Sequence, residues 1–254
     1  MKAAKVVRRN ALVFWRGWRS SMLLSVLAPV LFLSAMGLGL GSLVDPTTQA
    51  FEGAGYLAFF ATGMLAAHCM QSAVASSSYP MMSKLTWQRN YEAMLAAPLE
   101  VRDIFFGELT WIGATLAQQT IPFFVVMVLF GIFDSPLSVL AIPAAVLTGL
   151  GFAAAVMAFT ATLKTDEAFT WLFRFVVTPL FLLSGTFFPI DVLPSWAVVT
   201  AQLTPLYHGI ELIRGVTISK LSMFSGLVHL AYLVVFLAIG IMLGVRNLTH
   251  RLMP

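Results

Sequence analysis

Long apolar stretches separated by short polar segments make up most of this chain of 254 residues. Six of these stretches are long enough to cross a bilayer as helices, which takes about 20 residues each. They cover residues 22–44, 56–79, 109–133, 138–163, 169–187 and 223–245. The pattern predicts an all-α polytopic membrane protein, with residues 1–254 forming a single transmembrane domain of six helices.

The first apolar stretch follows basic residues, as the apolar region of a secretory signal peptide does. Residues 22–44 are longer than such a region, which has about 7–15 residues, and no small-x-small cleavage site ends them cleanly. We therefore interpret this stretch as a retained membrane span.

Residues 1–21 carry six basic side chains and no acidic one. Apolar residues are interleaved with them, and Trp15 and Trp18 stand near the end of the segment. One helical face holds Val7, Asn10, Ala11, Phe14, Trp15 and Trp18. This composition is typical of an amphipathic helix that lies flat in the membrane interface, and its positive charge places it on the cytoplasmic side.

Residues 80–108 form the most polar segment between the apolar stretches. Trp87, Tyr91, Met94 and Leu95 recur at helical spacing, which predicts one amphipathic helix over residues 84–98 that Pro98 ends. A second short piece, residues 100–106, then leads into the third span. The helix is either a solvated loop on the lipid headgroups or a docking element that takes force from a soluble partner. The spacing alone favours neither interpretation.

Residues 188–222 are too rich in proline to continue the fifth span. Residues 197–202 and 207–216 read as two short helices broken at Pro205. Because they are too short to span a bilayer and too apolar for water, we expect outer re-entrant or interfacial helices. Glu211 and Arg214 stand three residues apart on the second of them and can pair.

The distribution of basic residues predicts the orientation. Of the 15 Lys and Arg residues, twelve fall in segments expected on the inner side, whereas Arg214 and Lys220 fall on the outer side. Arg174 lies within the fifth span and is expected to snorkel inward. This asymmetry places both termini in the cytoplasm. The net charge of +4 then reflects contact with membrane lipid and indicates no nucleic-acid partner.

Polar side chains inside the second span have two interpretations. Gln71, Ser72 and Ser76 lie in its inner half, and such groups face either another helix or a water-filled path. The first interpretation is interhelical hydrogen bonding, and the second is the lining of a transport route. The absence of an internal repeat argues against an inverted-repeat secondary transporter.

The chain contains no G-x-x-x-x-G-K-[ST] nucleotide motif and no H-E-x-x-H metal motif. His208 and Glu211 lack a second spaced histidine, and His68 and His229 are expected to hydrogen-bond to neighbouring helices. We therefore predict no catalytic residue, no metal site and no bound cofactor. A membrane-embedded lipid or glycan transferase and an assembly scaffold remain as alternatives to a transporter.

Two blocks of sequence resemble a known family. The first runs from Trp87 to Leu99 and continues over residues 103–108, and the second covers residues 181–196, Thr204-Pro205-Leu206 and Glu211-x-x-Arg214. In their order and places within the six-span plan, they are similar to the membrane subunit of type-2 ABC exporters, the ABC-2 permeases. Within these they resemble the nodulation-factor and drug exporter branch. Many members end the first block with Gly-Lys where this chain has Gly-Glu108, which leaves the subfamily open.

The resemblance implies an exporter of an amphipathic, lipid-like, drug-like or oligosaccharide substrate in the bacterial cytoplasmic (inner) membrane. It implies two copies of this chain and two cytoplasmic ABC ATPase subunits, which hold the ATP and Mg. The implied ATPase-coupling residues are Arg8, Arg9, Arg16, Lys84, Trp87, Arg89, Tyr91, Glu92, Met94, Leu95 and Pro98. The substrate route would lie between the copies, lined by the first, second and fifth spans, and its implied residues are Gln71, Ser72, Ser76, Phe181, Ser184 and Phe187.

Overall fold

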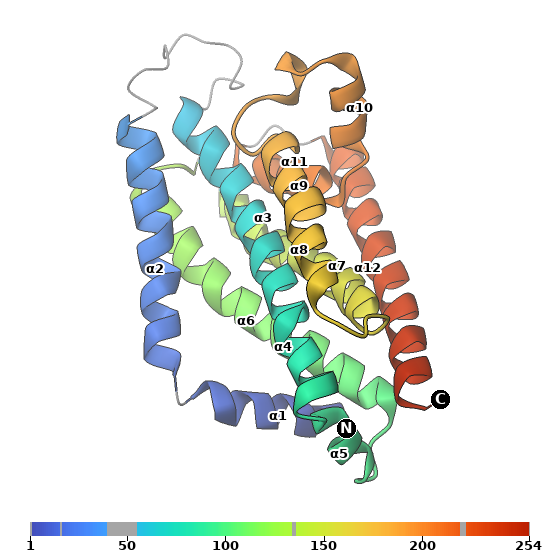
Figure 1. Cartoon of the computed structure of the whole chain (residues 1–254). Helices are drawn as coiled ribbons and strands as arrows, with labels where there is room; N and C mark the ends of the chain where they lie inside the picture. The colour runs from blue at the N-terminus through green and yellow to red at the C-terminus, as the bar shows by residue number, and fades with distance from the viewer. Residues whose placement is uncertain (1, 16, 40–54, 134–135, 219–221, 254) are drawn as a thin grey trace.

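The computed structural model describes residues 2–15, 17–39, 55–133, 136–218 and 222–253. Every regular element in these residues is a helix, and no strand occurs among them. The long helices stand side by side as a bundle, and α1 lies across one end of it (Figure 1). This confirms the all-α prediction.

The helices have the following bounds. They are α1 (Ala3–Phe14), α2 (Trp18–Ser34), η1 (Ala35–Gly39), α3 (Gly55–Ser77), α4 (Tyr79–Met82), η4 (Ser83–Trp87), α5 (Asn90–Leu95), α6 (Val101–Leu129), η5 (Pro136–Leu140), α7 (Ala141–Thr160), α8 (Glu167–Leu172), η6 (Phe173–Val177), α9 (Thr178–Leu183), η7 (Ile190–Val192), α10 (Ser195–Gln202), α11 (Pro205–Thr217) and α12 (Met223–Leu252).

Four helical segments in the described residues are long and apolar enough to cross a membrane: Gly55–Trp87, Val101–Leu129, Pro136–Thr160 and Met223–Leu252. They correspond to the second, third, fourth and sixth expected spans. The outer end of the first expected span falls in residues 40–54, outside the described residues. The helical run of the fifth ends at Leu183, before the expected residue 187. The full count of six spans therefore stays a prediction.

Helix α7 lies at the centre of the bundle and packs against α3, α6, α11 and α12. Ala153 and Ala154 of α7 are fully buried, and Gly240 of α12 lies against Ala154. These small residues allow the close helix packing that replaces the hydrophobic effect in a bilayer.

The N-terminal helix is shorter than the expected residues 1–21. Helix α1 ends at Phe14, the backbone N–H of Gly17 bonds to the Phe14 carbonyl at 2.9 Å, and α2 begins at Trp18 instead of residue 22. Glycine is a poor helix former, so the chain bends there and leaves the plane of α1. Arg16 lies outside the described residues.

The prediction of one amphipathic helix over residues 84–98 is wrong. The helix of the second span continues through α4 and η4 to Trp87, and a new helix, α5, begins at Asn90. Between them Arg89 has a left-handed backbone with φ of 49°. This break turns Tyr91 into the core while Trp87 is 61% exposed, so the two rings do not share a face.

The short piece expected over residues 100–106 is the first part of α6. The third-span helix begins at Val101, and the Asp103 carboxylate accepts a hydrogen bond from the Glu100 backbone N–H at 3.0 Å. Such a capping box satisfies N–H groups that a helix start leaves free. The polar segment is therefore mostly helical and joined directly to two spans.

The two short outer helices are confirmed as helices. Helices α10 and α11 are separated at Leu203 and Thr204, and the Thr204 hydroxyl accepts a hydrogen bond from the Tyr207 backbone N–H at 3.2 Å. Pro205 occupies the first turn of α11, where its missing N–H costs nothing. Their re-entrant placement in a membrane stays a prediction.

Candidate functional site

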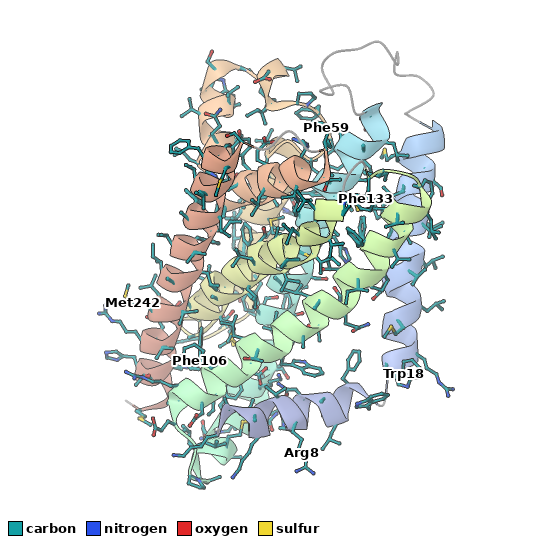
Figure 2. All side chains as sticks on the ribbon, turned by 180° about the vertical axis from the view of Figure 1, so that it is seen from behind. Arg8, Trp18, Phe59, Phe106, Phe133 and Met242 are labelled. Carbon is teal, nitrogen blue, oxygen red and sulfur yellow. The ribbon has the colours of Figure 1, made fainter. Side chains whose placement is uncertain are left out.

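Helix α1 is held against α6 by close contact at one point. Val6 is buried, and a Cβ atom added at Gly107 would lie 2.5 Å from the Val6 Cβ. Only glycine leaves room for α1 here. The opposite side of α1 presents Arg8, which points away from the bundle (Figure 2).

We expect Gly107→Ala to lower the unfolding midpoint of the protein. The new methyl group must push α1 away from α6, and such overpacking typically costs about 1–3 kcal/mol. Gly113→Ala on the same helix is the matched control, since its Cβ would meet the flexible end of Leu150 at 3.2 Å. Thermal unfolding in detergent separates the two variants. Equal midpoints for both would show that α1 is not held at Gly107.

A mostly buried ion pair ties the polar segment to the bundle under α1. The Lys84 ammonium lies 2.6 Å from a Glu108 carboxylate oxygen, and Glu108 is only 5% exposed. Lys84 also reaches the Asn10 side-chain oxygen at 3.5 Å, and the Arg9 guanidinium donates to the same oxygen at 3.4 Å. Three separate elements, α1, η4 and α6, thus meet through one charge pair.

Tyr91 of α5 is fully buried beside this pair. Burial, followed by the negative charge of Glu108, raises the pKa of the Tyr91 hydroxyl well above its usual range, which keeps it a neutral donor. Within the described residues, the Tyr91 hydroxyl, the second Glu108 oxygen and the Asn10 amide nitrogen make no hydrogen bond. A small shift of α5 could therefore improve the bonding of this cluster.

Other side chains of the polar segment, residues 80–108, are exposed on the surface. Trp87 is 61% exposed, and Arg89 pairs with Glu92 at 2.6 Å on the surface. Exposed pairs of this kind add little stability. Met94 and Leu95 are half-buried, and Pro98 is exposed. The expected coupling residues therefore divide into two sets. One set is available to a partner: Arg8, Trp87, Arg89, Glu92 and Pro98. The other holds the surface in place: Arg9, Lys84, Tyr91, Met94 and Leu95.

Of the second-span residues expected to line the substrate route, one makes a hydrogen bond to another helix. The Ser72 hydroxyl of α3 donates to the Gln119 side-chain oxygen of α6 at 2.6 Å. This favours the packing interpretation for Ser72. Gln71 and Ser76 are half-buried, and no hydrogen bond of their side chains is found in the described part of the chain.

The expected path residues of the fifth span gather where α9 ends. The rings of Phe181 and Phe187 meet edge to face at 4.9 Å, and Phe187 contacts Phe60 of α3 at 5.7 Å. Ser184 is buried and shares a hydrogen bond with Thr204 at 3.1 Å. These residues form a packed junction more than two helical turns along α3 from Gln71.

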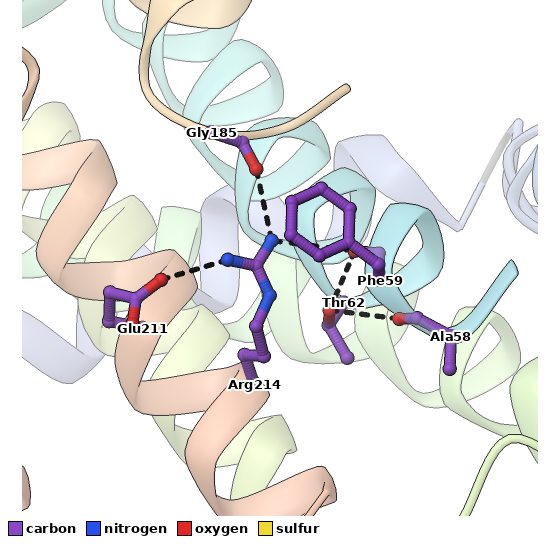
Figure 3. Close-up of polar contacts among 6 residues, drawn as sticks. All are labelled: Ala58, Phe59, Thr62, Gly185, Glu211 and Arg214. Atoms are coloured by element: carbon purple, nitrogen blue, oxygen red, sulfur yellow. Dashed lines mark hydrogen bonds and ion pairs between the residues drawn. The ribbon is translucent and has the colours of Figure 1, made fainter. Parts of the chain in front are cut away.

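A buried arginine joins three elements (Figure 3), at the end of the bundle away from α1 (Figure 1). Arg214 of α11 donates to Glu211 at 2.8 Å, to the Gly185 carbonyl at 2.9 Å and to the Phe59 carbonyl at 3.5 Å. Its guanidinium also lies 3.8 Å from the centre of the Phe59 ring. We call Phe59, Gly185, Glu211 and Arg214 the arginine cluster.

The arginine cluster was only partly predictable. The Glu211–Arg214 pair is confirmed, but Arg214 was expected among the charges of the outer segments, whereas the residue is only 5% exposed. Its partners on α3 and after α9 were missed. The available signal was an arginine in a mostly apolar helix, because such a charge needs several acceptors.

The expected hydrogen bonding of His229 to a neighbouring helix is confirmed. Its Nδ1 lies 2.8 Å from the Nδ1 of His208, so α12 is bonded to α11. The Tyr232 ring stacks on His208 at 3.8 Å. His68 instead contacts the Phe123 ring at 5.8 Å. Among the described residues, no group of three or more His, Cys, Asp or Glu side chains could hold a metal ion.

Comparison with known proteins gives consistent matches. A family model described as ABC-2 type transporter matches residues 4–218. The chain is 30% identical to Nodulation protein J of Rhizobium meliloti (strain 1021) over 249 residues, which are 98% of this chain and 93% of that protein. It is 32% identical to Nodulation protein J of Rhizobium leguminosarum bv. trifolii over 98% of this chain and 93% of that protein. The match to Nodulation protein J of Bradyrhizobium diazoefficiens reaches 33% over 85% of this chain and 80% of that protein.

Proposed function

Because the chain belongs to the ABC-2 type transporter family, as the membrane subunit of an ABC transporter, we propose that it forms an export path driven by a separate ATPase subunit. The resemblance drawn from the two sequence blocks is thereby confirmed. The proposed substrate is amphipathic and lipid-like, drug-like or an oligosaccharide, and it moves outward from the cytoplasmic side. This subunit would supply the route, and its partner would supply the nucleotide chemistry.

The observation that carries the proposal is the continuity between the exposed surface and a span. The helical run Gly55–Trp87 passes from the middle of the bundle to the exposed Trp87 with one bend at Ser78, across which the backbone hydrogen bonds to Val74 and from Met82 continue. The following α5 packs against α6, and its Tyr91 is fully buried. A push on Trp87 and its neighbours would therefore move rigid elements and not a loose loop.

The position of the chain ends supports the proposed orientation. The N-terminus and the C-terminus lie at the same end of the bundle (Figure 1). That end carries Arg8 and Arg9 on α1 and Arg246 and Arg251 on α12. By the positive-inside rule, we place this end in the cytoplasm of a bacterium, with the chain in its inner membrane.

The helical run formed by α8, η6 and α9 supports the pairing of this chain with a second copy of itself. It touches the rest of the chain at few places, one being Phe169 packed on Tyr79 at 4.9 Å. Trp171 and Phe175 are 65% and 59% exposed and stack on each other along its outer face. We propose that a second copy of this chain covers this face and that the substrate route runs between the copies.

Glu92→Lys tests the coupling surface. We expect substrate-stimulated ATPase activity of the complex and transport to fall roughly tenfold, because the variant reverses a charge on the surface offered to the ATPase subunit. Membrane insertion should survive, since the Arg89–Glu92 pair is exposed and adds little stability. The control is Asp191→Lys, which makes the same charge change at an exposed position of η7, away from the coupling surface and from the face proposed for the second copy.

Two results would contradict the proposal. Full coupling in the Glu92→Lys complex would remove this segment from the mechanism. Purified chain that moves cargo or hydrolyses ATP without an ATPase subunit would contradict the division of labour between the subunits.

A further inference from the structure

A cleft of about 570 Å³ lies between the start of α6 and the last turns of α12. Its lining residues are Arg102, Phe106, Ile241, Met242, Val245, Arg246, Thr249 and His250. Figure 2 shows Phe106 and Met242 on the two neighbouring helices. The cleft is separate from the coupling surface and from the arginine cluster.

The cleft is fixed by a close helix contact beside it. The Phe105 ring of α6 occupies the space where a side chain at Gly244 would lie. Phe105 is fully buried by this contact, whereas Phe106 and Met242 are 42% and 63% exposed. The two helices thus touch on one side and leave the cleft open on the other.

The lining separates charge from apolar surface. Arg102 and Phe106 stand one turn apart on α6, and Met242, Arg246 and His250 stand on successive turns of α12. The basic groups therefore lie towards the end of the bundle, about 5 Å from the apolar floor. Neither arginine forms an ion pair within the described ranges of the chain.

We propose that this cleft binds an anionic phospholipid of the cytoplasmic leaflet. Arg102 and Arg246 would hold the lipid phosphate through charge-assisted hydrogen bonds, and Thr249 and His250 offer further polar contacts. The acyl chains would lie on the apolar floor and continue along exposed residues of α12 such as Val235 and Ile239. Basic pockets between helices at the cytoplasmic surface favour such lipids.

The chemistry of the cleft selects this occupant over two others. A free anion would gain nothing from the floor of Phe106, Met242 and Val245. A second copy of the chain seated symmetrically here would bring two pairs of arginines together, which is unfavourable. The inference rests on the proposed orientation of the chain, because α12 must end on the cytoplasmic side.

A single fluorescent label can report on the cleft. Met242→Cys carries the label, since the natural Cys69 is fully buried. The protein is reconstituted without nucleotide in vesicles that contain either phosphatidylglycerol or phosphatidylcholine with brominated chains, which quench the label. We expect stronger quenching by phosphatidylglycerol at equal mole fraction. Leu243→Cys, on the same helix but outside the cleft lining, should show no such preference.

Charge variants show whether the preference comes from the cleft. Arg102→Gln together with Arg246→Gln should reduce the phosphatidylglycerol preference about fivefold for each arginine removed. Both side chains are exposed, so the fold should survive. Lys5→Gln together with Lys164→Gln removes the same charge from other exposed positions and should leave the preference unchanged.

Four results would overturn the proposal. They are equal quenching by the two lipids, a preference that survives loss of both arginines, displacement by inorganic phosphate alone, and disulfide formation between two Met242→Cys copies. Displacement by phosphate would indicate a free-anion site, and the disulfide would indicate a subunit interface. Because the assay needs no ATPase subunit, its failure would leave the Glu92→Lys test of the proposed function intact.

Discussion

The Glu108→Lys variant is expected to lose about 3 kcal/mol of stability together with all coupling to the ATPase subunit. The change places a second cation against Lys84, whose ammonium lies 2.6 Å from the present carboxylate, at a position only 5% exposed. A buried charge that loses its partner is strongly destabilising, and here the partner becomes repulsive. Denaturant unfolding in detergent and ATPase stimulation in the complex measure the two effects.

The reversed pair provides the control. Combining Lys84→Glu with Glu108→Lys restores opposite charges in the same place and should recover most of the lost stability. Glu108→Gln keeps an acceptor for Lys84 and should fall between the two. If the double variant is as unstable as the sum of its single changes, the two side chains are not coupled and the contact is incidental.

Arg214→Met is expected to have the second largest effect. It keeps the side-chain volume but removes the donors to Glu211 and to the carbonyls of Gly185 and Phe59. Leaving such buried groups without their donor costs about 2–3 kcal/mol, and the junction between α11, α3 and the turn after α9 should loosen. Transport should fall more than binding of the ATPase subunit, because the change lies at the other end of the bundle.

Arg174→Met is the matched control for this variant. Arg174 is exposed in η6, and the structure shows no salt bridge of its side chain within the described residues. Its loss should change stability by less than about 0.5 kcal/mol. Arg214→Lys should recover only part of the effect, since an ammonium cannot reproduce the planar set of donors. A wild-type melting curve for Arg214→Met would show that the cluster is not structural.

The long helices could be predicted because hydropathy acts over many residues, whereas the polar segment depends on single backbone angles. The periodicity of Trp87, Tyr91, Met94 and Leu95 fits one helix, and nothing in the sequence indicates a left-handed residue at Arg89. Asn and Asp adopt that conformation far more readily. The break at Arg89 could therefore not be predicted from the sequence pattern. It determines that Tyr91 is buried and that Trp87 is exposed.

The same distinction holds for the candidate site, where contacts between neighbouring residues could be predicted and contacts between distant elements could not. Local pairs such as Glu211–Arg214 appear in the sequence because helical spacing brings them together. The contact between Lys84 and Glu108 joins η4 to α6 and depends on how two helices cross, which periodicity does not encode. The same holds for the carbonyls around Arg214 and for the histidine pair between α11 and α12. The sequence indicated residues of interest, and tertiary packing assigned their partners.

The packing of α1 against Gly107 of α6 also constrains the order in which the protein assembles during its synthesis. The ribosome adds about 5–20 residues per second, so the N-terminal helix emerges on the order of 5–20 seconds before its binding place exists. During that interval its own amphipathic surface can keep it adsorbed on lipid, shielded from proteases and from premature pairing. Assembly of this end of the molecule is then completed late, when the third hydrophobic segment has entered the bilayer.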